Sequence, residues 1–466
     1  MAQATRTPVS ERMSGADALL WTISADPVMR PTIVALVVLD REPSWPEVRA
    51  RVEDLTEHLP RLRARVAGRG PRHLRPRFVP DGAFELDAHL RRVRLPAHGD
   101  LRDVLDLAQA MATSGFDAAL PLWEATLVEG VDAQRAVLVM KVHHALIDGV
   151  GGLAALARLF DPAGTEAEAE AAGPDAGAST PDDAGEGSGS GSGSGAKHHG
   201  RDLPDAVKVV DETLDAVRHP LRSLGQLATL GGSVARLLAP APSPVSPIMR
   251  GRGVRRHAEV LDVDLATLKA AARAWDATLN DVFVAAVVRG LGVYHEQHGA
   301  TSRGFRTLMP VNVRAEDDAE GGNRFVPVRF VVPVRRDVAD TVAEVRRLAG
   351  EWKHAPGLAV SDVLAGGLSA LPDPVARGLW GSMLRGNDVC ITNVPGPPVP
   401  VTLGGAPVEG IYALSPPSGA ALNVAMVTTA ERACIAITAD AAAVPDSAKL
   451  AGCIDDGFAE VCSAHG

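Results

Sequence analysis

The sequence predicts an α/β protein built from two halves. Its 466 residues exceed what one ordinary hydrophobic core organises, and 46% of them are apolar, which is enough for two cores. Patterns typical of strands and of helices also alternate on both sides of a segment that has almost no bulky apolar residue.

The N-terminal half is predicted to span residues 1–162. Apolar, β-branched runs indicate strands at 32–39, 123–128 and 136–144, and apolar residues at helical spacing indicate helices at 45–59, 101–114 and 150–160. The last of these helices has two glycines in its first turn.

Residues 163–203 are predicted to be a disordered linker. They consist of Glu/Ala repeats, a Pro/Asp stretch and a Gly/Ser alternation, which cannot bury a core. A flexible chain of this length spans on the order of 35 Å, which is enough to cross the face of a domain.

The C-terminal half, 204–466, begins with an amphipathic helical pattern from Val207 to Leu227 that breaks near Pro220. We expect this stretch to pack on the two halves, with membrane contact as the alternative, since its polar face has few basic residues. Helices are expected at 265–275 and 281–294, and strands at 307–313, 325–334, 389–394, 422–428 and 434–439.

Charge and cysteine content restrict the class of protein. The net charge is −10, but seven acidic side chains lie in residues 163–196, so the rest of the chain carries −3 and nothing predicts a nucleic-acid partner. The four cysteines form no CxxC pair and have no zinc-finger spacing, which is typical of reduced thiols in a cytoplasmic protein. The polar N-terminus lacks a signal-peptide pattern, and no apolar run is long enough to span a bilayer, so lipid handling would require peripheral contact with a membrane.

The chemistry is predicted to lie in the segment from Lys141 to Gly149, which has the pattern His-His-x-x-x-Asp-Gly. Adjacent residues of a strand point to opposite faces, so His143 and His144 cannot easily bind one ion, and we expect no metal site. A neutral imidazole at a strand end is suited to take the proton of an alcohol that attacks a thioester, and we assign this role to His144. Asp148 is expected to shape the loop by capping a helix or pairing with an arginine, and Gly149 to allow a backbone conformation that a Cβ would forbid. The alternative is that both histidines are hydrogen-bonded core residues.

The motif and several other segments resemble the wax ester synthase/diacylglycerol acyltransferase family of the CoA-dependent acyltransferase superfamily. The further segments occur in the family's order and are Ser14 to Asp17 with Leu19, Pro121-Leu122-Trp123-Glu124, Asn280-Asp281, residues 310–314 with 322–324, and Thr392 to Pro397. The Asp-Phe-Gly-Trp-Gly motif of several other superfamily members is absent.

The resemblance implies two chloramphenicol-acetyltransferase-like halves with a channel between them. It implies acyl-CoA as co-substrate, no cofactor, and diacylglycerol or a long-chain alcohol as acceptor, with triacylglycerol or wax ester as product. It also implies His144 as general base, His143 in support, and Asp148 in a salt bridge that holds the loop. Arg61, Arg63 and Arg65 are the candidate partners of Asp148, and membrane or lipid-droplet contact is consistent with these substrates.

Two alternatives stay open at this point. The chain would be an acyltransferase with a different acceptor, such as a polyketide or sugar hydroxyl, or a lipid-binding protein that has lost turnover. The intact His144, Asp148 and Gly149 argue against the second alternative. A Walker-type phosphate loop and a Gly-x-Ser-x-Gly elbow are both missing from the sequence, which excludes common NTPases and lipases.

Overall fold

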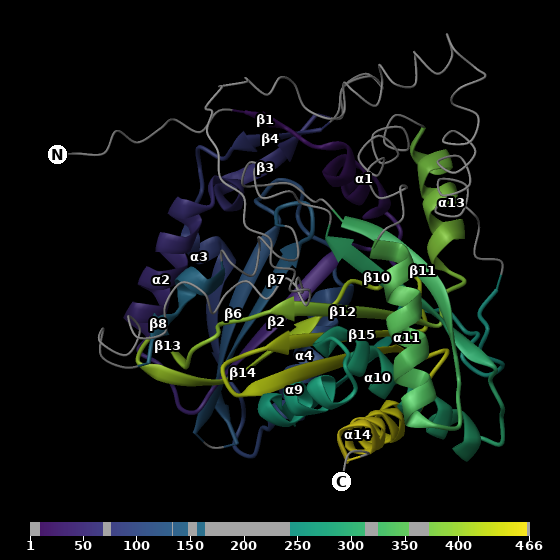
Figure 1. Cartoon of the computed structure of the whole chain (residues 1–466). Helices are drawn as coiled ribbons and strands as arrows, with labels where there is room; N and C mark the ends of the chain where they lie inside the picture. Colours follow the sequence, from purple (N-terminus) through teal and green to yellow (C-terminus); the bar gives the residue numbers. More distant parts are fainter. Residues whose placement is uncertain are drawn as a thin grey trace, which may run out of the picture.

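Two large β-sheets organise the protein (Figure 1). The computed structural model describes residues 10–68, 76–132, 134–147, 156–163, 243–312, 325–353 and 372–463. The predicted linker and the amphipathic stretch at 207–227 lie outside these residues, as does most of the helix predicted at 150–160.

The first sheet contains seven of the described strands. Their order is β5 (Leu90–Arg94), β6 (Trp123–Val131), β7 (Arg135–His143), β2 (Thr32–Leu39), β14 (Ala406–Leu414), β13 (Val401–Leu403) and β8 (Asp161–Pro162). The second sheet contains six, in the order β11 (Phe325–Pro333), β10 (Gly304–Asn312), β12 (Val389–Pro395), β15 (Leu422–Thr428), β16 (Arg432–Asp440) and β9 (Arg256–Asp264). A small sheet of β1 (Glu11–Arg12), β4 (Arg77–Pro80) and β3 (Ala64–Ala67) flanks the first.

The C-terminal half contributes strands to the first sheet. β14 pairs antiparallel with β2, with Leu414 opposite Val34, and β13 then pairs with β14 and β8. The first sheet is therefore completed by residues that follow it by more than 230 positions, which the pattern of strands in the sequence did not indicate.

Helices cover the sheets in separate layers. On the first half they are α1 (Gly15–Ile23), α2 (Trp45–His58), α3 (Leu86–His89) and α4 (Leu101–Thr113), with the 3-10 turns Pro60–Arg63 and Ala157–Leu159. On the second half they are α9 (Leu265–Ala274), α10 (Leu279–Gln297), α11 (Val338–Lys353), α13 (Asp373–Leu384) and α14 (Ser447–Ser463).

Three large buried cores follow from this layering of the described elements, beside a small fourth cluster around Leu308 and Cys390. One lies on the outer face of the first sheet beneath α1 and α2, and another lies on the outer face of the second sheet beneath α9, α10, α11 and α14. The third joins the inner faces of the two sheets, where Leu36 and Val139 meet Ala436, and α4 adds Val104 and Leu105. α1 and α13, from different halves, lie beside each other at one end of the molecule (Figure 1).

The helix pair α10 and α14 is the most closely packed of the second half. A Cβ built on Gly457 would lie 2.3 Å from the Ala286 carbonyl oxygen, and one built on Gly290 would lie 2.5 Å from the Ile454 Cα. Two glycines that face each other across the crossing therefore let the two backbones approach.

Most predicted elements are confirmed. The strand predicted at 32–39 is exact, and the strands and helices predicted at 45–59, 101–114, 123–144, 265–294 and 389–439 differ from the structure mainly at their ends. The prediction had no counterpart for the longer elements α1, β9, α11, α13, β14 and α14, nor for the short elements β1, β3, β4, α3, β5, β8 and β13. Among the described helices, none alone has the length and apolarity to cross a membrane; α9 and α10 meet that test only as a pair, bent by 97° at their junction.

Candidate active site

The two histidines stand at the end of a central strand. β7 pairs with β6 on one side and with β2 on the other, and its last residue, His143, lies opposite Thr32. Along β7, Leu138 belongs to the outer core and Val139 to the core between the sheets, which confirms the predicted alternation of faces.

His143 is buried and hydrogen-bonded through both ring nitrogens. Only 1% of the surface of His143 is exposed to solvent. Nδ1 accepts a hydrogen bond from the Ala145 N–H at 3.1 Å, so in the neutral ring the proton is on Nε2, which lies 2.7 Å from the Ser24 hydroxyl. The rings of Trp21 and Phe116 pack against it at centroid distances of 5.9 and 5.8 Å.

This environment keeps His143 neutral. Burial, with a smaller contribution from the neighbouring His144, lowers the pKa of His143 to about 3. A ring with no solvent access and both nitrogens engaged is poorly placed to exchange protons with a substrate.

His144 has a different environment. It is partly exposed, while Ala145 and Leu146 after it are buried. Its backbone N–H donates to the Pro31 carbonyl at 2.8 Å, and the Leu146 N–H donates to the His143 carbonyl at 2.9 Å. Of the two histidines, His144 is therefore the one that is partly exposed, although its Nδ1 atom is buried.

An arginine joins the loop after the histidines to α1. Arg61 donates to the Ala145 carbonyl at 3.4 Å and to the fully buried carboxylate of Asp17 at 3.5 Å, and it also pairs with Glu11. Ser14 caps α1 by accepting the Asp17 N–H, which fixes that carboxylate's position.

The other site residues predicted from the sequence either lie outside the described residues or have contacts elsewhere in the fold. Asp148 and Gly149 lie outside the described residues, so their roles stay predictions. Arg63 bonds Thr56 and pairs with Glu57, and Arg65 is exposed on β3. Of the three candidate arginines, Arg61 is the one that donates to the loop after the histidines.

Lys141 is a buried cation that the sequence reasoning did not single out. Its Nζ donates to Glu124 Oε1 at 2.6 Å, to Ser114 Oγ at 2.7 Å and to the Gly115 carbonyl at 3.0 Å, and lies 4.3 Å from the centre of the Phe116 ring. Burial lowers the pKa of Lys141, and the Glu124 carboxylate opposes that shift. The sequence does contain a feature that could have indicated this buried ion pair. A single lysine interrupts an otherwise apolar strand, and the neighbouring strand contains the Glu of Pro-Leu-Trp-Glu.

The remaining segments of the resemblance mostly shape the fold. Asp281 forms a reciprocal capping box with Thr278 at the start of α10, so it stabilises the helix terminus. Asn280 donates to Met309 Sδ at 3.4 Å. Gly396 approaches the Thr428 carbonyl so closely that a Cβ would lie 2.7 Å from the oxygen.

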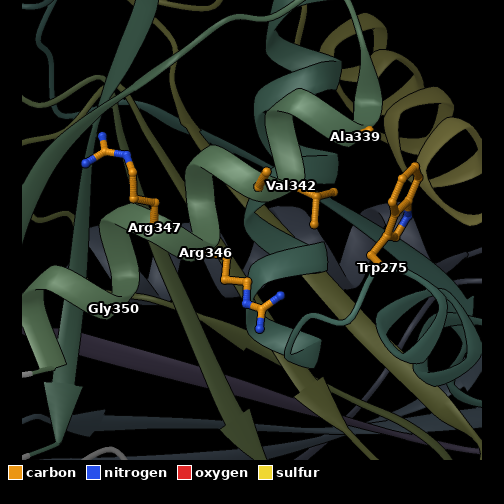
Figure 2. A pocket seen from close by; sticks show the side chains of 7 residues that line it. Trp275, Ala339, Val342, Arg346, Arg347 and Gly350 are labelled. Carbon is orange, nitrogen blue, oxygen red and sulfur yellow. The ribbon is translucent and has the colours of Figure 1, made fainter.

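Two other features of the second half are excluded as the reaction centre. Ser246 Oγ lies 2.7 Å from His295 Nε2, as in a hydrolase pair, but the two residues are 0% and 1% exposed. A pocket of about 390 Å³ lies between Trp275 and the α11 residues Val342 and Arg346 (Figure 2). Val342 and Trp275 belong to the outer core of the second sheet, and Arg346 is paired with Asp276 at 2.7 Å, so none of the motif residues lines this pocket.

Thiol and metal chemistry receive no support from the described part of the chain. The four cysteines are free thiols, and three are buried. Within the ranges that the structure describes, no group of three His, Cys, Asp or Glu side chains has the arrangement of a metal site.

The buried state of His143 predicts a pH dependence of folding stability. Its pKa is near 6.5 in an unfolded chain and about 3 in the fold, so between these values the unfolded chain binds more protons and stability falls as the pH is lowered. The contribution of His143 to the free energy of unfolding is complete above pH ~6.5. Below that pH, the free energy of unfolding falls by up to about 1.4 kcal/mol per pH unit. Urea unfolding of wild type and His143→Gln from pH 5 to 7.5 measures this: the wild type is expected to have the steeper dependence, and parallel curves would contradict the buried neutral ring.

Comparisons with known proteins agree with this arrangement. Residues 13–283 match the model of the wax ester synthase/diacylglycerol acyltransferase catalytic domain, and residues 321–461 match the C-terminal domain of the same family. A Mycobacterium tuberculosis protein that bears the name diacylglycerol O-acyltransferase is 33% identical over 481 residues, covering 100% of this chain and 95% of its own.

Two solved structures share the fold. The wax ester synthase/diacylglycerol acyltransferase from Marinobacter aquaeolei VT8 has a TM-score of 0.59 at 19% identity and covers 97% of this chain and 98% of its own. The starter condensation domain of rhizomide synthetase, solved in complex with C8-CoA and Leu-SNAC, has a TM-score of 0.59 at 14% identity and covers 98% of this chain and 95% of its own. These likenesses confirm the predicted two-halved α/β fold.

Proposed function

This chain belongs to the wax ester synthase/diacylglycerol acyltransferase family of acyl-CoA-dependent O-acyltransferases, and we propose that it transfers a fatty acyl group from acyl-CoA to diacylglycerol, to a long-chain alcohol, or to both. The products are triacylglycerol and wax ester. The observation that carries the proposal is the contrast within the motif, where His143 is buried and neutral while His144 is partly exposed at the end of β7.

In the proposed reaction, His144 acts as general base. The hydroxyl of the acceptor gives its proton to the imidazole as its oxygen attacks the thioester carbonyl. A C–O bond forms, the C–S bond breaks, and the proton passes from the imidazolium to the leaving CoA sulfur. The acyl group moves directly between substrates, so His144 forms no covalent intermediate.

The rest of the motif is proposed to hold this ring in place. We assign Asp148 to a salt bridge with Arg61, because Arg61 already contacts the Ala145 carbonyl three residues before it. Gly149 is assigned to the turn that follows.

The choice of donor and acceptor rests on the relatives. The name of the mycobacterial relative supports diacylglycerol as acceptor, and the complex of the rhizomide condensation domain with C8-CoA supports acyl-CoA as the donor for this fold. Substrates this apolar partition into membranes or lipid droplets, so we also propose peripheral contact with a lipid surface.

An assay with labelled palmitoyl-CoA tests the assignment. The purified protein receives diacylglycerol, hexadecanol, a sugar alcohol or no acceptor, and labelled products are separated by chromatography. We expect label in triacylglycerol, in wax ester or in both. Label only in the sugar product would favour the different-acceptor alternative, and palmitoyl-CoA binding without any transfer would favour a lipid-binding protein.

A further inference from the structure

The chain from Asp17 to Pro31, which comprises most of α1 and the turn after it, is linked to the backbone of His144 and of Ala145, directly at Pro31 and through Arg61 at Asp17. The Pro31 carbonyl accepts the His144 N–H, and Asp17 binds Arg61, which donates to the Ala145 carbonyl. Ser24, between these two residues in the chain, contacts the ring of His143.

Ser24 takes part in a series of hydrogen bonds in which the donor and the acceptor of each bond can be assigned. The Ser24 hydroxyl donates to the Leu20 carbonyl at 2.9 Å, so the same oxygen accepts from Nε2 of His143 at 2.7 Å. Nδ1 of His143 in turn accepts the Ala145 N–H. The hydroxyl therefore fixes both the tautomer and the orientation of a ring that holds the peptide following His144.

We propose that Ser24 is a positioning residue for acyl transfer, acting through the His143 ring on the Ala145 peptide and so on the orientation of His144. This inference rests on the proposed role of His144 as base. Ser24 itself touches no reacting atom: its contribution is that His143 accepts, rather than donates, at Nδ1. Without the hydroxyl, the buried Nε2–H loses its hydrogen-bond acceptor. That unpaired donor is energetically unfavourable, so the ring is expected to rotate or to change tautomer.

Ser24→Ala tests this, with Ser24→Thr as the conservative variant and Ser382→Ala as the matched control. Ser382 lies on α13, outside the loop of the histidines, and its hydroxyl also donates to a carbonyl one turn back, that of Leu379 at 2.7 Å. Since displacement of a catalytic group by about 1 Å costs up to about a hundredfold in rate, we expect Ser24→Ala to lower kcat on the order of tenfold or more with KM within about twofold. Ser24→Thr and Ser382→Ala are expected to stay near the wild-type kcat.

A double-mutant cycle separates positioning from a general loss of stability. If Ser24 acts through the ring, Ser24→Ala has no further effect on kcat in a His143→Ala background. A wild-type kcat for Ser24→Ala, or an equal loss of kcat in both backgrounds, would overturn the proposal.

A spectroscopic readout keeps this test distinct from that of the proposed function. ¹⁵N NMR of the histidine rings is expected to show His143 as the neutral Nε2–H tautomer in the wild type and altered in Ser24→Ala, whether or not turnover occurs. An unchanged His143 signal would overturn the inference, while absence of transfer by the wild type with the expected tautomer in place would count against the proposed function alone.

Discussion

Replacing His144 with alanine is expected to lower the rate of acyl transfer by about 10²–10⁴-fold, the usual contribution of a positioned general base. The fold should survive, because His144 is a partly exposed residue and its backbone hydrogen bond to Pro31 does not need the side chain. The measurement is steady-state transfer from labelled palmitoyl-CoA to the preferred acceptor, with the urea midpoint determined on the same preparation.

The control for this variant is His58→Ala, which removes an exposed histidine near the end of α2. It is expected to keep wild-type activity. A His144→Ala enzyme with wild-type turnover would remove His144 from the chemistry, and a large fall in its urea midpoint would assign the loss to folding.

Gly457→Ala is expected to be strongly destabilising. The new Cβ would lie 2.3 Å from the Ala286 carbonyl oxygen and 2.7 Å from the Gly290 nitrogen, and these are backbone atoms that cannot rotate away. The helices α10 and α14 must therefore separate, which loosens the outer core of the second sheet. Overpacking of this kind costs on the order of 3 kcal/mol.

Gly452→Ala provides the comparison within the same helix. Gly452 is exposed, and a Cβ there meets no atom within 4 Å, so alanine should stabilise α14 by roughly 0.5–1 kcal/mol. Urea unfolding of wild type and of both variants measures the change in the free energy of unfolding that each substitution causes. Equal stability of Gly457→Ala and Gly452→Ala would show that the close approach of α10 and α14 is not needed by the fold.

Local patterns predicted the central strands well. The run at 32–39 and the alternation through 136–144 specify strands because burial on both faces demands apolar side chains, and the motif placed both histidines at a strand end. The strand β7 ends at His143, and His144 is the first residue of the turn that follows, so the period of a strand does not set the direction of its ring. The sequence did not indicate which ring would be buried, because that depends on Trp21, Phe116 and Ser24 arriving from other elements.

The elements without a counterpart in the prediction depend on long-range packing. β14 is a strand of the first sheet although its residues follow the second half's β12 in the chain, and local periodicity carries no information about such a crossover. α14 is rich in Ala, Gly and Cys, and its buried face becomes recognisable only against the glycines of α10. The pair of Arg61 with Asp17 joins residues 44 positions apart, so the choice among the three candidate arginines needed coordinates.

Chemical rescue of His144→Ala by imidazole is the most direct test of the central claim, that the imidazole of His144 takes the acceptor's proton. With saturating palmitoyl-CoA and acceptor, we expect added imidazole to raise the transfer rate of His144→Ala in proportion to its concentration and to leave wild type and His143→Ala unchanged. Transfer by His144→Ala that matches the wild type without imidazole, or an equal response to imidazole in all three proteins, would contradict that claim.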